Sequence, residues 1–226
     1  MMSPSLFSIF DPSTPPLLNM NWLSSLIPIV IIPSSFWLTS SKFSLIHKFL
    51  IILAHKEFKP AMATSFKKGT SLILVSLMMF ILINNSMGLL PFIFTTTSHL
   101  LLCLLLALPF WLSFMAYGWF NNSVSMFSHL IPTGTPMFLS VFMVFVETIS
   151  NLIRPITLSV RLTANMIAGH LILTLLSSTF SMESMSPLFL IPFIPEILLI
   201  SLEMAVAIIQ AYVFTILICL YSTEIH

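Results

Sequence analysis

Two apolar runs in the second half of the chain are too long to cross a membrane upright. Residues 137–178 and 187–222 hold no cluster of turn residues, and as helices they would measure about 63 and 54 Å. A hydrocarbon core is only ~30 Å thick, and a helix tilted by ~40° uses only about 39 Å of its length in crossing it. Each run therefore either bends into two spans or lies far from the membrane normal. We expect a hairpin of two long, steeply inclined membrane helices.

The composition also indicates a membrane environment. Of the 226 residues, 58% are apolar and 7% are charged, whereas soluble proteins carry about 25% charged residues. The apolar runs do not alternate with polar residues as β-barrel strands do, so the fold class is an all-α membrane protein. The net charge of +1 gives no reason to expect nucleic acid as a partner. Cys103 and Cys219 lie in apolar stretches and are expected to be buried thiols; no metal or cofactor is expected.

Shorter segments precede the hairpin. Residues 17–38 predict an N-terminal spanning helix, interrupted by prolines that neighbouring helices can accommodate. Residues 70–90 and 100–120 predict two more spanning helices. Asn84 and Asn85, inside the first of these two, are expected to form interhelical hydrogen bonds.

A basic segment, residues 42–68, separates the first two spans and holds six of the eight basic residues. Its apolar residues recur at helical spacing, which predicts an interfacial amphipathic helix, with an ordinary charged loop as the alternative. Basic loops stay on the cytoplasmic or matrix side, so we expect the N-terminus outside and, after five crossings, the C-terminus inside. A polar connection with turn signals follows at residues 121–136.

The chain is expected to form one membrane domain, residues 1–226. Within it, residues 1–135 would supply the spanning and peripheral helices with the basic segment, and residues 136–226 the hairpin. Ionisable groups inside a membrane are costly and usually functional, and nearly all of those in membrane segments fall in the hairpin. They are Glu147, Arg154, Arg161, His170, Glu196 and Glu203, accompanied by the amides Asn151, Asn165 and Gln210.

Helical geometry orders these polar residues. On the first long helix, one face carries Glu147, Arg154, Arg161 and Asn165. On the second, positions spaced by seven form one stripe of Glu196, Glu203 and Gln210. Residues at one level of an antiparallel pair share a constant index sum, which is 371 for Arg161 with Gln210 and 373 for His170 with Glu203. We therefore expect Arg161 level with Gln210, and His170 nearly level with Glu203.

An arginine in mid-membrane is a fixed positive charge, because it keeps its proton at any physiological pH. Carboxylates and imidazole on either side of it can relay protons. Two proton-accessible regions separated by Arg161 would form a path without a short circuit. A partner with its own mid-membrane carboxylate is then needed to carry the proton past Arg161.

The same residues carry a family resemblance. The run from Glu147 to His170, ETISNLIRPITLSVRLTANMIAGH, resembles the signature helix of ATP synthase subunit a, particularly its mitochondrial form. The run EMAVAIIQAYVF, beginning at Glu203, resembles that family's last helix, and NSMGLLP (85–91) and PTGTP (132–136) match family connectors. The resemblance covers nearly the whole chain.

The resemblance implies a proton-translocating stator subunit of a rotary F-type ATP synthase. This subunit performs no catalysis of its own. Arg161 would face the c-ring, attract the deprotonated c-subunit carboxylate and prevent proton leakage, while Asn165 and Gln210 would line the same surface. The implied partners are the c-ring, other Fo stator and peripheral-stalk subunits, protons and lipid. The implied location is the mitochondrial inner membrane, with the N-terminus in the intermembrane space and the C-terminus in the matrix.

The resemblance also implies two offset half-channels. His170 and Glu203 would be the polar pair of the outer half-channel; in bacterial relatives the histidine and the acid are exchanged. Glu147 would serve the inner half-channel. For Arg154 a structural role and a place on the proton path both stay open, as do a channel-mouth role and a solvated position for Glu196. Coupling to sodium instead of protons also stays open, because the ion-selecting site lies mainly on the c subunit.

Two other functions fit the sequence less well. A secondary transporter would show an inverted repeat and a clustered substrate site, and the sequence shows neither. An intramembrane protease would need a Gly-x-Ser-x-Gly-like elbow or a His-Glu-x-x-His motif, and neither occurs.

Overall fold

The computed structural model is helical throughout its regular structure. It describes residues 6–13, 20–33, 39, 41–62, 69–90, 93–131, 136–183 and 193–224. Three short 3₁₀ helices are η1 (Leu6–Phe10), η2 (Met20–Leu26) and η3 (Thr96–Ser98). The α-helices are α1 (Ile27–Ile31), α2 (Lys42–Ala61), α3 (Thr70–Gly88), α4 (Leu100–Asn121), α5 (Ser123–His129), α6 (Met137–Glu183) and α7 (Phe193–Glu224).

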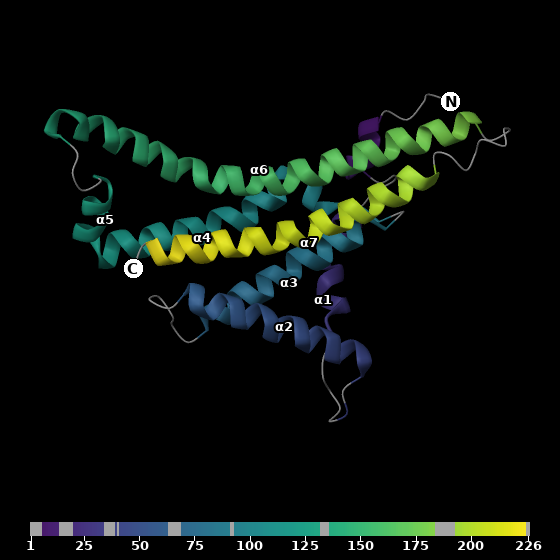
Figure 1. Ribbon diagram of the computed structural model, residues 1–226, viewed down its shortest axis with the longest axis horizontal. Helices are drawn as coiled ribbons and strands as arrows, with labels where there is room; N and C mark the ends of the chain where they lie inside the picture. The colour runs from purple at the N-terminus through teal and green to yellow at the C-terminus, as the bar shows by residue number, and fades with distance from the viewer. Residues whose placement is uncertain are drawn as a thin grey trace.

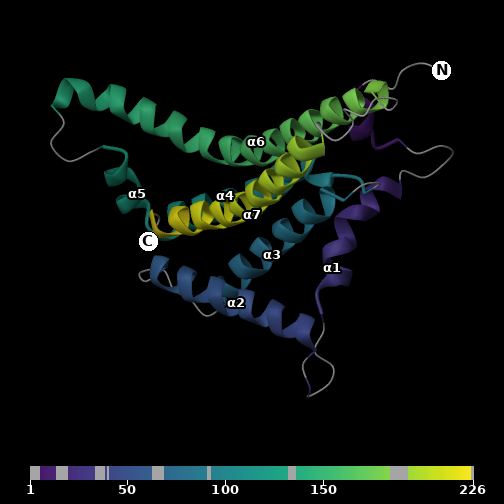
Figure 2. The same ribbon diagram turned by 45° about the vertical axis from the view of Figure 1, so that its right-hand side comes forward.

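The two long helices, α6 and α7, run antiparallel and dominate the molecule (Figure 1). With 47 and 32 residues, they measure about 70 and 48 Å. Helix α6 contains Pro155 and is visibly bowed in Figures 1 and 2. An interior proline removes one backbone hydrogen bond and bends a helix without ending it. The single continuous α6 is therefore compatible with the proline in its middle.

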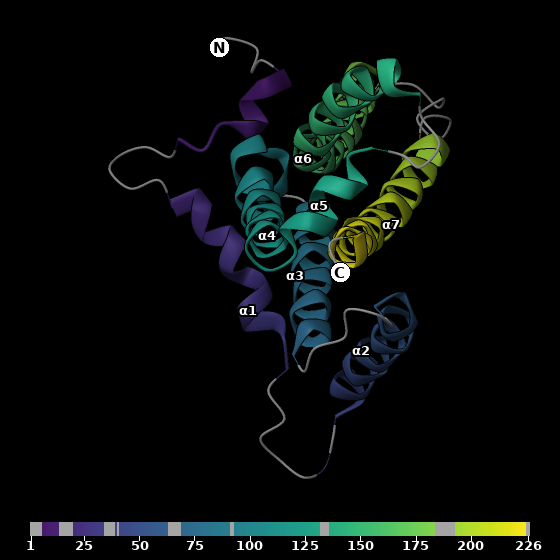
Figure 3. The same cartoon turned by 90° about the vertical axis from the view of Figure 1, so that its left-hand side faces the viewer.

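Helices α3 and α4 pack against one side of this hairpin, α3 mainly on α7 and α4 mainly on α6 (Figure 3). The core between them is apolar and includes Phe58, Ile81, Leu162 and Phe214, each at most 1% exposed. Four helices (α3, α4, α6 and α7) are long and apolar enough to cross a membrane. Large apolar side chains such as Phe138, at 97% exposure, cover much of the outer surface. Lipid or partner subunits are the natural environment for such a surface.

Helix α2 lies across the lower edge of α7 and α3 (Figures 1 and 3). Ser41 caps its N-terminus by accepting a hydrogen bond from the Ser44 amide, which satisfies one free helix-end donor. Buried Phe58 anchors it to the core, while Phe49 is 64% exposed on another face. The helical prediction is thus confirmed for residues 42–61, and the charged-loop alternative is wrong there. Lys67 and Lys68 lie outside the described residues.

Some boundaries differ from the sequence predictions. The expected first span is described only as a short apolar helix, Met20–Ile31; its flanks, residues 14–19 and 34–38, lie outside the described part. The connection at residues 121–136 is predicted to be a loop, but its first half folds as α5. Phe127 of α5 meets Trp119 of α4 edge-to-face, with 4.9 Å between the ring centroids. Helix α6 continues past residue 178 to Glu183, since no proline or glycine stops it there.

Candidate functional site: polar groups along the α6–α7 hairpin

A side-chain hydrogen bond joins the two long helices near their middle. Asn165 on α6 donates from Nδ2 to Oε1 of Gln210 on α7, at 3.0 Å. Asn165 is exposed on the outer face of α6, whereas Gln210 is 6% exposed. Arg161 was predicted to lie level with Gln210; in the structure the side chain of Gln210 bonds to Asn165, one turn after Arg161 on α6.

Arg161 lies one turn before Asn165 on α6, and its side chain is exposed. Leu162 and Leu158 on the same helix are buried against the core, so the buried and exposed faces of α6 are distinct here. Within the described ranges Arg161 forms no hydrogen bond and no ion pair. An unpaired guanidinium on a membrane-facing surface is expensive unless an anion from outside the chain meets it. Its surroundings therefore suit an external carboxylate.

The second predicted level pair is confirmed. His170 Nε2 lies 4.0 Å from Glu203 Oε1, with the two side chains 13% and 7% exposed. The Glu203 side chain packs directly over Gly169, where a Cβ would come within 2.7 Å of the Glu203 carboxyl carbon. Only glycine leaves this space open. Both Glu203 oxygens and His170 Nε2 are buried and have no hydrogen-bond partner among the described residues; buried polar atoms of this kind ordinarily bond to water.

Other buried polar groups extend this region, and the sequence reading did not single them out. The η3 segment packs on α3, α4 and α6, and it buries Thr96, Thr97 and Ser98 together with the preceding Thr95. A Cβ on Gly88 would meet Thr95 and Met166, which places this loop against α6 one turn before His170. The hydroxyl-rich composition of TTTS was the available signal.

Asn84 and Asn85, at the end of α3, were predicted to form interhelical hydrogen bonds. Asn85 is fully buried, yet neither its Nδ2 nor its Oδ1 has a partner in the described structure; Asn84 Nδ2 is likewise unpaired. The expected interhelical hydrogen bonds are thus wrong for these atoms. Buried amides without protein partners ordinarily hydrogen-bond to water, so this end of the molecule is suited to hold water.

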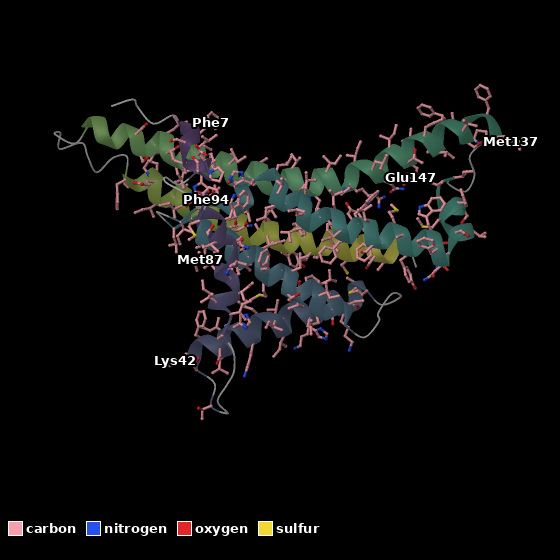
Figure 4. All side chains as sticks on the ribbon, turned by 180° about the vertical axis from the view of Figure 1, so that it is seen from behind. Phe7, Lys42, Met87, Phe94, Met137 and Glu147 are labelled. Carbon is pink, nitrogen blue, oxygen red and sulfur yellow. The ribbon has the colours of Figure 1, made fainter. Side chains whose placement is uncertain are left out.

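The N-terminal segment also contacts His170, through Phe10. The ring of Phe10 in η1 meets the imidazole edge-on at a centroid distance of 6.3 Å. Farther along, His99 packs between Trp22 and Phe94, at 5.1 and 5.3 Å between ring centroids. Phe10 therefore covers one side of the His170 ring. Figure 4 shows Phe7 and Phe94 near the same end of the molecule.

Glu147 lies in the N-terminal half of α6, toward its Met137 end (Figure 4), and precedes Arg161 in the same helix. It pairs with Arg154 at 3.8 Å, and Arg154 also lies over the ring of Tyr221 at 5.0 Å from its centroid. Both residues line a cavity of about 710 Å³ between α4, α5, α6 and α7, whose wall includes Trp111 and Asn151. Arg154 therefore makes specific contacts, and Glu147 faces an open space.

Glu57 is a polar residue that the sequence reading missed. Its carboxylate, on α2, accepts a hydrogen bond of 2.6 Å from the Tyr212 hydroxyl on α7. The available signal in the sequence was that Glu57 is a single acidic residue among the lysines of residues 42–68. Glu196 is half-buried in the first turn of α7, and nothing else in the described structure involves it. Among the described residues no group of histidine, cysteine and acidic side chains is arranged to hold a metal, and Cys103 and Cys219 are buried free thiols.

Comparison with known proteins places this arrangement in a family. The family model described as ATP synthase A chain matches residues 18–223. Proteins named ATP synthase subunit a from Anopheles quadrimaculatus, Anopheles gambiae and Drosophila melanogaster are each 52% identical to the chain over all 226 residues, covering both sequences completely. With a match of this extent, the chain belongs to the ATP synthase subunit a family.

Proposed function

We propose that the chain is the proton-conducting stator subunit of a rotary ATP synthase and has no catalytic activity of its own. The observation that carries the proposal is Arg161, an exposed cation with no partner in the described part of the chain, on the outer face of a long hairpin. It attracts the deprotonated carboxylate of a c-ring subunit. Asn165, one turn away, lines the same surface, and its hydrogen bond to the buried Gln210 links the two helices.

The outer half-channel passes the His170–Glu203 pair. These residues lie about 14 Å from Arg161 along α6, among buried polar atoms that have no protein partner. A proton from the outer side reaches Glu203 through water, with His170 beside it as a second relay group. It then passes to the ring carboxylate, which loses its attraction to Arg161 once it is neutral.

The inner half-channel lies on the Glu147 side. Glu147 is about 21 Å from Arg161 along α6 and faces the 710 Å³ cavity. A protonated ring carboxylate that arrives there releases its proton toward the inner side. Because Arg161 cannot lose its proton, the two half-channels connect only through rotation of the ring. Transfer of one charge across 100 mV supplies about 2.3 kcal/mol, so several protons drive each ATP.

The placement in the membrane follows from length and charge. Helix α6 is more than twice as long as the ~30 Å core, so the hairpin is steeply inclined. The described lysines of α2 support a position of this helix at the inner interface, with the N-terminus outside and the C-terminus inside. For the mitochondrial inner membrane these sides are the intermembrane space and the matrix. The exposed apolar surfaces away from Arg161 contact lipid, other Fo subunits and the peripheral stalk.

Side-specific thiol labelling tests the two half-channels. The two variants are Thr174→Cys and Asn151→Cys. Thr174 follows His170 by one helical turn, and Asn151 follows Glu147 by one helical turn. In vesicles of the intact complex, a small membrane-impermeant thiol reagent added outside is expected to block pumping only in Thr174→Cys, and the reagent added inside only in Asn151→Cys. Unmodified complex is the control for the native thiols. Equal blocking of both variants from one side would contradict two offset half-channels.

A further inference from the structure

The Glu57–Tyr212 contact is the one polar link between the basic helix α2 and the hairpin that neither half-channel explains. The Tyr212 hydroxyl donates to Glu57 Oε2 at 2.6 Å, and the Glu57 side chain is exposed. A short hydrogen bond to a carboxylate is charge-assisted and holds the acceptor in a defined place. The carboxylate is therefore fixed, yet open to water.

The register of the hairpin determines where Tyr212 lies along the hairpin axis. The pairs Asn165–Gln210 and His170–Glu203 fix which residues lie opposite each other. By this register, Tyr212 lies level with Arg161 to within about 3 Å along the hairpin axis. Tyr212 also follows Gln210 toward the C-terminal half of α7, away from Glu203. Glu57 thus lies beside α7 near the level of Arg161, on the side of Gln210 that leads to the inner side.

Glu57 and Glu147 differ in their partners. The Glu57 carboxylate accepts a hydrogen bond from a neutral hydroxyl group and forms no ion pair within the described residues. Glu147, in contrast, is already paired with Arg154 at 3.8 Å.

We propose that Glu57 is a second proton acceptor of the inner half-channel, held in place by Tyr212. The proposal rests on the proposed function above. A protonated ring carboxylate that has passed Arg161 gives its proton, through water, to the Glu57 carboxylate. The ring group becomes a carboxylate and Glu57 becomes a neutral acid, which then releases the proton to water at the inner surface. Tyr212 keeps its own proton throughout and acts as a positioning residue.

Two variants separate proton transfer from a purely structural clamp. Glu57→Gln keeps an amide oxygen that can accept from the Tyr212 hydroxyl but removes the group that takes up a proton, whereas Tyr212→Phe removes the hydrogen bond and leaves the carboxylate in place. In intact complex in vesicles, we expect Glu57→Gln to lower proton-driven ATP synthesis about tenfold and Tyr212→Phe less than about twofold. The first loss is smaller than the ~100-fold typical of a general acid–base group, because Glu147 and water also accept protons.

Glu57→Asp and an added buffer provide further readouts. Aspartate keeps a carboxylate but is too short to keep the bond to Tyr212, so it is expected to retain most of the activity. Imidazole on the inner side is expected to restore part of the activity of Glu57→Gln and to leave unmodified complex unchanged. Lys48→Gln, which alters another exposed charge nine positions away on α2, is the matched control.

The outcomes are distinct. Equal losses in Glu57→Gln and Tyr212→Phe, without rescue by imidazole, would make the contact a structural clamp and overturn the proposal. Normal synthesis in Glu57→Gln would overturn it too. If Arg161→Ala in the same assay still abolishes coupled synthesis, the proposed function stands and only the role of Glu57 fails; normal coupling in Arg161→Ala would overturn both.

Discussion

Asn165 and Gln210 are joined by a side-chain hydrogen bond of 3.0 Å that crosses the hairpin one turn from Arg161. Asn165 is exposed while Gln210 is buried, so the bond links the outer face of α6 to the packed interior of α7. A contact of this kind fixes how the two helices slide and rotate relative to each other. The position of Arg161 on the surface depends on that alignment.

Loss of either amide is expected to loosen this alignment. Asn165→Ala and Gln210→Ala should each lower the free energy of unfolding by about 1 kcal/mol, and a double-mutant cycle should give a coupling of about 0.6 kcal/mol, as is typical of hydrogen bonds within membranes. Thermal unfolding of the detergent-solubilised complex measures both. Thr157→Ala, on the exposed face of α6, is the control. Strictly additive losses would mean that the amides do not act as a pair.

Gly169 is expected to be intolerant of a side chain because Glu203 packs against it. Gly169→Ala would bring Cβ within 2.7 Å of the Glu203 carboxyl carbon and displace the carboxylate from His170. Since Glu203 ends a flexible side chain, the protein should still fold, while ATP-driven pumping should fall about tenfold. In a Glu203→Asp background the shorter acid leaves room for Cβ, so the additional loss from Gly169→Ala should largely disappear. A loss of the same size in both backgrounds would refute this explanation.

His170 and Glu203 are close enough, at 4.0 Å, to exchange places. The double variant His170→Glu with Glu203→His keeps one acid and one imidazole in the same space. It should therefore pump better than either single variant, which has two acids or two imidazoles. Pumping rates of the three variants, normalised to the amount of assembled complex, give the comparison. A double variant no better than the worse single one would show that the identities at the two positions are not interchangeable.

Arg154 is expected to stabilise the inner half of the hairpin without conducting protons. It pairs with Glu147 and lies over Tyr221; its removal should cost about 1–2 kcal/mol of stability but leave pumping coupled. Arg154→Gln should lower the unfolding temperature of the complex, with hydrolysis and pumping still in a fixed ratio. A proton leak in Arg154→Gln would instead place Arg154 on the proton path.

The sequence predicted the hairpin and the His170–Glu203 pair because both follow from helical geometry alone. The lengths of the apolar runs determine the long helices, and an antiparallel register determines which indices lie level. In the structure, His170 faces Glu203 and Phe10, whereas Arg161 is exposed.

The remaining features depend on side-chain reach and on segments far apart in sequence. Gln210 bonds to Asn165, one turn after Arg161, and an index sum gives the level of two residues but not which side chains meet. The Glu57–Tyr212 contact joins residues 155 positions apart, and no periodicity predicts such a pair. Asn85 appeared suited to interhelical bonding from its type alone, yet its amide has no partner in the described structure.

The central claim is that Arg161 is the charge that separates the two half-channels. The most direct measurement compares ATP-driven pumping and passive proton leak in vesicles of intact complex carrying Arg161→Ala or Arg161→Lys, with and without a c-ring blocker, and with Arg154→Gln as the matched control. The account predicts that pumping is lost in both Arg161 variants, that a blocker-sensitive leak appears in Arg161→Ala, and that Arg154→Gln shows neither effect. Normal coupled pumping without leak in both Arg161 variants would contradict it, and the half-channel assignments would fall with it.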